Sequence, residues 1–240
     1  LSALQNFFAV PWTVPSDELD MEERSFVLHE AGHYLFLVGR LRDAIEPMRL
    51  SMEIHEKEGW WEQASAGARL IREVNLFLGE LDQAHTFSIK GNELANKSNS
   101  RFQRMGLRAS LGQVLFYVGD TEAAKNKFVE AEKIQAERNP ELPRLVYIWG
   151  FWFCECLLDP VEELAEKSDH PTDKIRLEAE TRLEEVERRA TEALKEAKRW
   201  GTDFDIAHDE LTLGRVAYLK MRFNQSKQSD RAKQMLDKAI

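Results

Sequence analysis

The feature that most constrains this chain is an apolar stretch ending in glycine that returns every 40 residues. The three copies are Leu35-Phe-Leu-Val-Gly39, Asn75-Leu-Phe-Leu-Gly79 and Leu115-Phe-Tyr-Val-Gly119. An alanine follows each glycine five residues later and opens a second amphipathic stretch, at Ala44, Ala84 and Ala124. Glycine and proline are otherwise sparse, with 12 and 7 in 240 residues, and good helix formers dominate. Each copy is therefore predicted to be two helices joined by a short turn.

A helical hairpin of this kind cannot cover the apolar faces of both its helices, so successive hairpins must stack. We therefore expect an all-α, right-handed α-solenoid of about five long units of about 40 residues each. Residues 1–20 are predicted to be the tail of a preceding helix and a proline-containing linker, and residues 21–240 the superhelix. Its units are expected at about 23–60, 61–100, 101–140, 141–200 with an insertion at 159–176, and 201–240.

The last unit is expected to carry Leu213-Gly214 on its first helix, and Ala232, Leu236 and Ala239 on its second. The chain begins without a methionine and stops at Ile240 inside a predicted helix. We therefore expect it to be a piece of a longer protein.

Small residues recur where the two helices of a hairpin must approach closely. The first unit has Leu28, Ala31-Gly32 and Leu35 on its first helix, then Ala44 and Met48. The third has Arg108, Leu111-Gly112 and Leu115, then Ala124, Phe128 and Ala131. The second unit is degenerate, with Arg72 in place of the glycine. This pattern resembles the tetratricopeptide repeat (TPR), which implies a superhelix whose first helices line a concave groove.

The long period and several segments resemble one group within that class more closely. The segments are Phe7-Phe8-Ala-Val-Pro11-Trp12, Gly39-Arg-Leu-Arg-Asp-Ala-Ile-Glu-Pro47, Phe102-Gln-Arg-Met105 and Leu211-Thr-Leu213-Gly214. The chain looks similar to the C-terminal repeat region of bacterial NACHT-type (STAND) signal-transduction ATPases. That resemblance implies a cytoplasmic sensor or autoinhibitory region that follows an ATPase domain in the same chain.

The composition argues against several classes of partner. Thirty-three lysines and arginines stand against 42 aspartates and glutamates, a net charge of −9, which argues against a nucleic-acid or anionic-lipid surface. The basic stretch from Lys220 to Lys238 lacks interleaved aromatics beyond Phe223, so nucleic acid is not the expected partner. The longest charge-free apolar stretch, Leu145 to Cys154, is far shorter than the roughly 20 residues of a membrane span.

Three further features of the sequence bear on cofactors and catalysis. The sequence has no glycine-rich phosphate-binding motif, so no cofactor is expected. Cys154 and Cys156 lie in an apolar run and are predicted to be buried structural cysteines in a reducing compartment.

His29-Glu30-Ala31-Gly32-His33 matches the H-E-x-x-H zinc-protease signature. Two histidines four apart on a helix could ligate one metal ion, with Glu30 activating a bound water. The simpler interpretation assigns Ala31-Gly32 to helix packing, because the same pair of positions holds Leu111-Gly112 and Leu213-Gly214. No metal site is therefore expected, and a metal-dependent hydrolase that uses His29 and His33 remains the alternative.

The candidate binding site is the predicted concave groove. Side chains on the first helices that point away from the packing glycine are expected to line it: Phe26, His29, Glu30, His33, Phe36, Arg69, Glu73, Leu76, Ser110, Gln113, Phe116, Tyr117, Tyr147, Phe151 and Glu155. Such a mixture of aromatic and isolated charged groups suits a peptide or protein ligand. Each aromatic could instead pack between adjacent repeats.

We therefore predict a protein-interaction module with no catalysis of its own. An independent scaffold or adaptor TPR protein is a further alternative, and it would have no nucleotide-binding loop upstream of Leu1.

Overall fold

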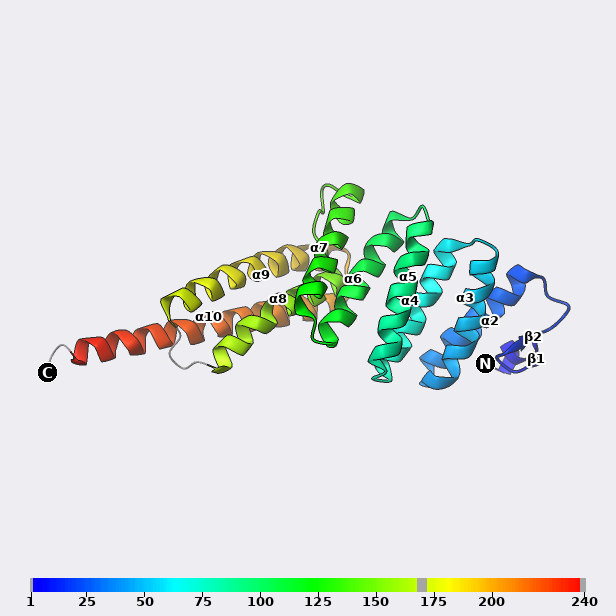
Figure 1. Cartoon of the computed structure of the whole chain (residues 1–240), viewed down its shortest axis with the longest axis horizontal. Coiled ribbons are helices and arrows are strands. Elements are labelled where there is room, and N and C mark those ends of the chain that lie inside the picture. Colours follow the sequence, from blue (N-terminus) through cyan, green and yellow to red (C-terminus); the bar gives the residue numbers. More distant parts are fainter. Residues whose placement is uncertain (1, 168–171, 238–240) are drawn as a thin grey trace. The chain divides into compact units, whose positions relative to one another are not determined.

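The computed structural model describes residues 2–167 and 172–237, with side chains described for residues 3–167 and 172–223. The chain divides into two units, Leu1–Pro140 (unit 1) and Glu141–Ile240 (unit 2), and each is described by itself. The described residues form ten helices and one small two-stranded sheet (Figure 1). This confirms the expected all-α class.

Unit 1 contains three helical hairpins. They are α2 (Met21–Leu37) with α3 (Leu41–Lys57), α4 (Trp61–Phe77) with α5 (Leu81–Lys97), and α6 (Arg101–Tyr117) with α7 (Thr121–Arg138). The first helices begin at Met21, Trp61 and Arg101, and these starts are as far apart as Gly39, Gly79 and Gly119 are in the sequence. The period read from the sequence is therefore the period of the structure.

The three turn glycines end the first helix of each hairpin. Gly39, Gly79 and Gly119 have φ of +78°, +73° and +87°, a left-handed conformation that glycine adopts without steric cost. The amide that follows each glycine donates back to the helix, as the Arg40 N–H does to the Leu35 carbonyl at 2.8 Å. This closure satisfies carbonyls that the helix end would leave unpaired.

Helix packing within a hairpin depends on a second set of glycines, inside the first helices. A Cβ added at Gly32 would lie 2.5 Å from Met48 Cγ on α3, and one at Gly112 would lie 3.1 Å from the Phe128 ring on α7. Large side chains of the second helices therefore sit directly on the first helices. In the first two hairpins a shared core runs from one hairpin to the next and includes Leu35, Met48, Ala68 and Ile71.

The segment before α2 differs from the expected helix tail and linker. A four-residue helix α1 (Ser2–Gln5) precedes two short antiparallel strands, β1 (Phe8–Val10) and β2 (Val14–Pro15). Phe8 and Trp12 stack edge to face and pack with Val27 and Leu28 of α2. The segment covers the apolar face that α2, as the first of the stacked helices, would otherwise expose.

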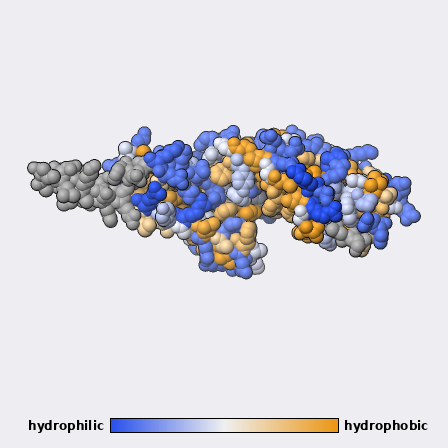
Figure 2. Space-filling model, turned by 90° about the horizontal axis from the view of Figure 1, so that it is seen from below, coloured by the Kyte–Doolittle hydropathy of each residue, from blue (hydrophilic) through white to orange (hydrophobic). Residues whose placement is uncertain are grey.

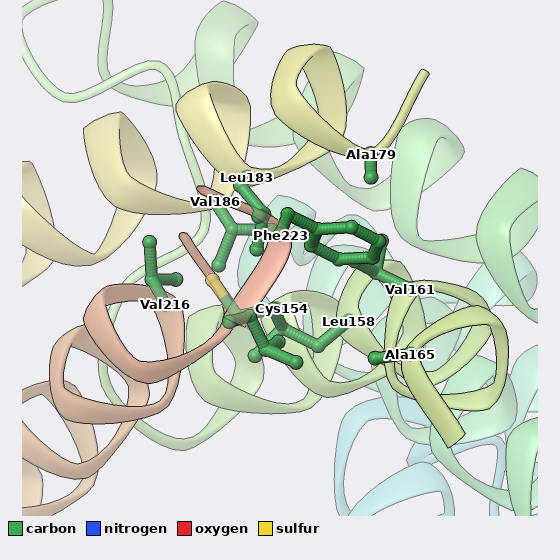
Figure 3. Close-up of a cluster of buried hydrophobic side chains, with 10 residues drawn as sticks. Cys154, Leu158, Val161, Ala165, Ala179, Leu183, Val186, Val216 and Phe223 are labelled. Carbon is green, nitrogen blue, oxygen red and sulfur yellow. The ribbon is translucent and has the colours of Figure 1, made fainter. Parts of the chain in front are cut away.

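Unit 2 is built from three long helices, α8 (Tyr147–Lys167), α9 (Asp173–Trp200) and α10 (Asp203–Asp237). They share one core, in which Leu158 of α8, Leu183 of α9 and Val216 of α10 meet (Figure 3). Cys154 belongs to this core, and Cys156 is buried as well. Both cysteines are therefore buried, as predicted.

One local expectation for unit 2 is wrong. The fifth pair of helices is one continuous helix, α10, because Met221 stands where Gly39 and Gly119 end the equivalent helices. The first part of the expected insertion at 159–176 belongs to α8, which passes through Pro160 and ends at Lys167, whereas residues 168–171 in its middle lie outside the described residues. Burial of Leu158, Val161 and Ala165 on both sides of Pro160 offsets the cost of a proline inside a helix.

No helix in residues 2–167 and 172–237 combines the length and the apolar character that a membrane span requires. Figure 2 shows that hydrophobic residues nevertheless reach the surface in patches between hydrophilic ones. Exposed large hydrophobic side chains lie on the first helices of unit 1 and on α10, among other places.

Candidate functional site

In unit 1 the predicted groove residues lie at equivalent positions of α2, α4 and α6. One set is His33, Glu73 and Gln113, and another is Phe36, Leu76 and Phe116. The side chains of neighbouring helices also meet: the rings of Phe36 and Phe77 lie 5.7 Å apart, and Arg72 Nη1 donates to Gln113 Oε1 at 2.9 Å. We call this continuous face the first-helix surface.

The ends of the first helices carry exposed apolar side chains on this surface. Leu37, Phe77 and Tyr117 occupy one position in the three repeats and are 61%, 66% and 42% exposed. Phe26, near the start of α2, is 61% exposed. Phe26 and Tyr117 are among the residues predicted from the sequence to line the groove, whereas Leu37 and Phe77 are not. Leu37 and Phe77 could have been identified from the sequence, because they lie 80 and 40 residues before Tyr117, at the same position of the repeat.

Arg72 is the most unusual residue of the first-helix surface, because it replaces the packing glycine of its repeat. Arg72 is only 6% exposed, and among the described residues no hydrogen-bond acceptor reaches its Nε. Burial lowers its pKa to about 10, although Glu73 opposes the shift. Ser88 on α5 stands at the position that Met48 and Phe128 hold in the other two hairpins. The second hairpin therefore has the large residue on its first helix and the small one on its second helix.

Helix α2, in the hairpin before that of Arg72, carries two half-buried histidines. The rings of His29 and His33 are 6.4 Å apart and nearly parallel. Burial lowers the pKa of His29, and His33 and Arg69 lower it further against the opposing effect of Glu30. A lowered pKa keeps His29 uncharged at neutral pH. In the described part of the chain, no group of three histidine, cysteine or acidic side chains is placed to hold a metal ion.

The remaining predicted residues of α4 and α6 differ in their accessibility. Arg69 and Glu73 form a loose ion pair on α4, with 3.7 Å between Nη1 and Oε2, and both are about one-third exposed. A solvated pair of this kind orients the side chains more than it stabilises the fold. Ser110 is 2% exposed, so it lies in the helix interface and not on the surface where it was expected.

The residues predicted from the fourth repeat lie in unit 2. Phe151 is a core residue, because its ring stacks on His208 of α10 with 4.1 Å between ring centres. Its expected place in the groove is therefore wrong. Glu155 is half-buried and pairs with Arg215 of α10. Burial raises the pKa of Glu155, and Arg215 acts in the opposite direction. Tyr147 begins α8 and is half-buried.

Asp209 of α10 is a buried carboxyl that sequence analysis did not single out. It is 2% exposed, and its Oδ2 has no hydrogen-bond partner among the described residues. Burial raises its pKa to about 7, and the nearby Asp205 adds to the shift. Its position among polar residues of α10 gave no sign of burial, because that burial depends on the helices packed around it.

A shallow depression of about 450 Å³ lies elsewhere, on the second helix α7. Its lining is formed by Ala123, Asn126, Lys127, Val129, Glu130 and Lys133. Two of these lining residues form an ion pair, with 2.7 Å between Lys127 Nζ and Glu130 Oε1. None of the predicted groove residues contributes to this depression.

Comparison with known proteins identifies the fold. No protein-family model matches the chain, and no curated protein sequence does. A STAND protein with a tetratricopeptide repeat sensor, PH0952 from Pyrococcus horikoshii, matches with a TM-score of 0.60 at 15% identity, over 91% of this chain and 32% of that protein. The chain therefore spans about a third of that protein's length.

Two further solved structures match to a similar extent. The apo form of RapI has a TM-score of 0.57 at 12% identity, over 93% of this chain and 56% of RapI. The TPR-like repeats of a putative kinesin light chain from Podospora anserina also have a TM-score of 0.57, at 11% identity, over 92% of this chain and 100% of theirs. Similarity at these identities establishes the fold, and the fold of this chain is that of the tetratricopeptide repeat proteins.

Proposed function

We propose that this chain is a non-catalytic protein-interaction module that binds a peptide or protein segment on the first-helix surface of unit 1. The observation that carries the proposal is the row of exposed apolar side chains that the repeat produces, Leu37, Phe77 and Tyr117. Apolar groups this exposed, arranged in a line beside polar ones, are typical of surfaces that recognise another chain.

The polar groups of the same surface supply orientation. Glu73 pairs loosely with Arg69, which orients this partly exposed cation. Binding to side chains that are already held costs less conformational entropy than binding to free ones. An extended segment with large apolar side chains and a few polar groups suits this arrangement.

The test uses short peptides selected from a phage-displayed library against the whole chain. Phe77→Ala and Tyr117→Ala are each expected to weaken binding of the selected peptides at least tenfold, as loss of a hot-spot anchor of about 1.4 kcal/mol or more does. The melting temperature should not change, because both side chains are exposed. Isothermal titration calorimetry measures the affinities.

The matched control is Ile89→Ala on the second helix α5, where the side chain is 42% exposed. This substitution removes a similar apolar area from a different face of the same hairpin. An equal loss of affinity in the Ile89→Ala variant would refute the proposed site. So would peptides whose affinity is unchanged in all three variants.

The finer part of the proposal concerns the parent protein. We infer that the chain is the sensor or autoinhibitory region of a cytoplasmic, bacterial NACHT-type (STAND) ATPase and follows the ATPase domain. The segments around Phe7, Gly39 and Phe102 support this inference, together with the similarity to a STAND protein with a TPR sensor. The coding sequence before Leu1 tests it: a G-x-x-x-x-G-K-[ST] loop is expected there. A coding sequence without such a loop favours an independent scaffold.

A further inference from the structure

The longest stretch of the chain without an aspartate or a glutamate, residues 94–119, ends α5 and forms α6. It carries four basic residues, Lys97, Arg101, Arg104 and Arg108. Its charge of +4 leaves −13 for the rest of the chain, within the total of −9. Positive charge concentrated in one part of an otherwise acidic chain attracts anionic groups to that part.

The structure brings three of these residues together with a fourth cation from α7. Lys97 is the last residue of α5, Arg101 is the first of α6, and Arg104 follows about one turn later. Arg138 is the last residue of α7, and its guanidinium carbon lies 5.3 Å from the centre of the Phe102 ring, which follows Arg101. We call Lys97, Arg101, Arg104 and Arg138 the basic patch.

The charges of the basic patch are not neutralised within the described part of the chain. None of its four cations forms an ion pair with a described carboxylate, whereas Arg108 pairs with Glu130 at 3.6 Å and is left out of the patch. Three of the four cations are exposed, and Arg104 is half-buried. The basic patch can therefore pair with a partner's carboxylates without first breaking ion pairs of its own.

Aromatic rings position two of these cations. Lys97 Nζ lies 4.7 Å from the centre of the Trp61 ring on α4, as Arg138 lies over Phe102 on α6. Arg138 also donates to the neutral Gln135 Oε1, at 3.1 Å. A cation over an aromatic ring keeps its charge. A side chain that is already positioned loses less conformational entropy when a partner binds.

The basic patch lies apart from the first-helix surface. Arg101 begins α6 and Tyr117 ends it, about 24 Å away along the helix axis. Successive helix residues are about 100° apart, which places Arg104 on the side of α6 opposite to Gln113. Binding at the basic patch is therefore a property separate from the function proposed above, and either one can fail without the other.

The charge of the chain favours a short acidic segment over a nucleic acid as the partner. A nucleic acid carries a negative charge on every phosphate, so it would extend past the basic patch onto a protein whose remaining charge is −13. A protein segment with a few neighbouring carboxylates matches the few cations of the patch. Arginine suits such a segment, because its guanidinium can donate two parallel hydrogen bonds to one carboxylate.

We propose that the basic patch binds an acidic segment of a partner protein through ion pairs to Lys97, Arg101, Arg104 and Arg138. The segment crosses the ends of α5, α6 and α7, where these cations lie.

Fluorescence anisotropy with a labelled hexaglutamate peptide tests the proposal, with hexaglutamine as the uncharged control peptide. The whole chain is expected to bind hexaglutamate and not hexaglutamine at low salt, and added salt should weaken the binding. Arg101→Gln and Arg138→Gln are each expected to weaken it about threefold or more, because each removes one exposed cation of the patch. Helical circular dichroism should not change, since both side chains are exposed.

The matched control is Lys125→Gln, which removes an exposed cation near the other end of α7 and should leave the affinity unchanged. Phe77→Ala should also leave it unchanged, because Phe77 belongs to the first-helix surface. An equal loss in Lys125→Gln would overturn the proposal, and so would a wild-type chain that does not bind hexaglutamate at low salt. Tighter binding of a single-stranded oligothymidylate, weakened by the same two arginine substitutions, would overturn the choice of partner.

Discussion

The exchange of small and large residues in the second hairpin gives a quantitative prediction. Arg72 and Ser88 stand where Gly32 and Met48 stand one repeat earlier, and Gly112 and Phe128 one repeat later. Arg72→Gly should lower the free energy of unfolding by about 2–4 kcal/mol, because it removes a buried side chain with its hydrogen bond to Gln113 and places a glycine inside a helix. Ser88→Met alone should cost about 1–3 kcal/mol through overpacking against Arg72.

The double variant rebuilds the Gly32–Met48 contact in the second hairpin. Its loss of stability should therefore be smaller than the sum of the single losses by about 2 kcal/mol, a coupling within the range measured for residues in contact. Urea unfolding followed by circular dichroism gives the four free energies of the cycle, and hydrogen exchange locates the change in α4 and α5. When two substituted residues do not touch, their changes in the free energy of unfolding add to within about 0.5 kcal/mol. Additivity at that level would refute the equivalence of positions 72 and 88 with 32 and 48.

Further predictions concern stability. Gly32→Ala should lower the free energy of unfolding by about 1–3 kcal/mol, because Met48 Cγ would lie 2.5 Å from the new methyl group; Gly214→Ala, which has open space, should raise the free energy of unfolding by up to about 1 kcal/mol. Urea unfolding of both variants checks this pair, and equal effects would contradict it. The pKa of Asp209, raised to about 7, means that the native state keeps a proton that the unfolded chain releases near pH 4. Stability should therefore fall as pH rises from about 4 to about 7, and Asp209→Asn should reduce the fall. An equal fall in wild type and variant would contradict the assignment.

Local sequence rules predicted the repeat of unit 1 because its signals lie within each hairpin. Gly39, Gly79 and Gly119 each end a helix by adopting a conformation that other residues avoid. The same rule, applied to the missing glycine at Met221, would have predicted the single helix α10. Weak alanine spacing after residue 230 suggested a hairpin there instead. Pro160 is accommodated inside α8, since tertiary burial outweighs its cost.

The accessibility of the candidate site was harder to predict than its helices. Phe151 and Phe77 both lie on predicted first helices, yet one is 7% exposed and the other 66% exposed. The difference comes from His208 of α10, which stacks on Phe151, and a residue so distant along the chain leaves no signal in the local pattern. Periodicity identifies the face of a helix, whereas burial depends on what packs against that face.

The most direct test of the central claim places a photoreactive benzoylphenylalanine in the full chain, either at position 77 on α4 or at position 89 on α5. Both positions carry exposed apolar side chains of the same hairpin. A selected peptide is irradiated with each variant, and the crosslinked product is measured by mass spectrometry. Binding on the first-helix surface predicts strong crosslinking from position 77 and little from position 89. Crosslinking from position 89 that equals or exceeds that from position 77 would contradict the account.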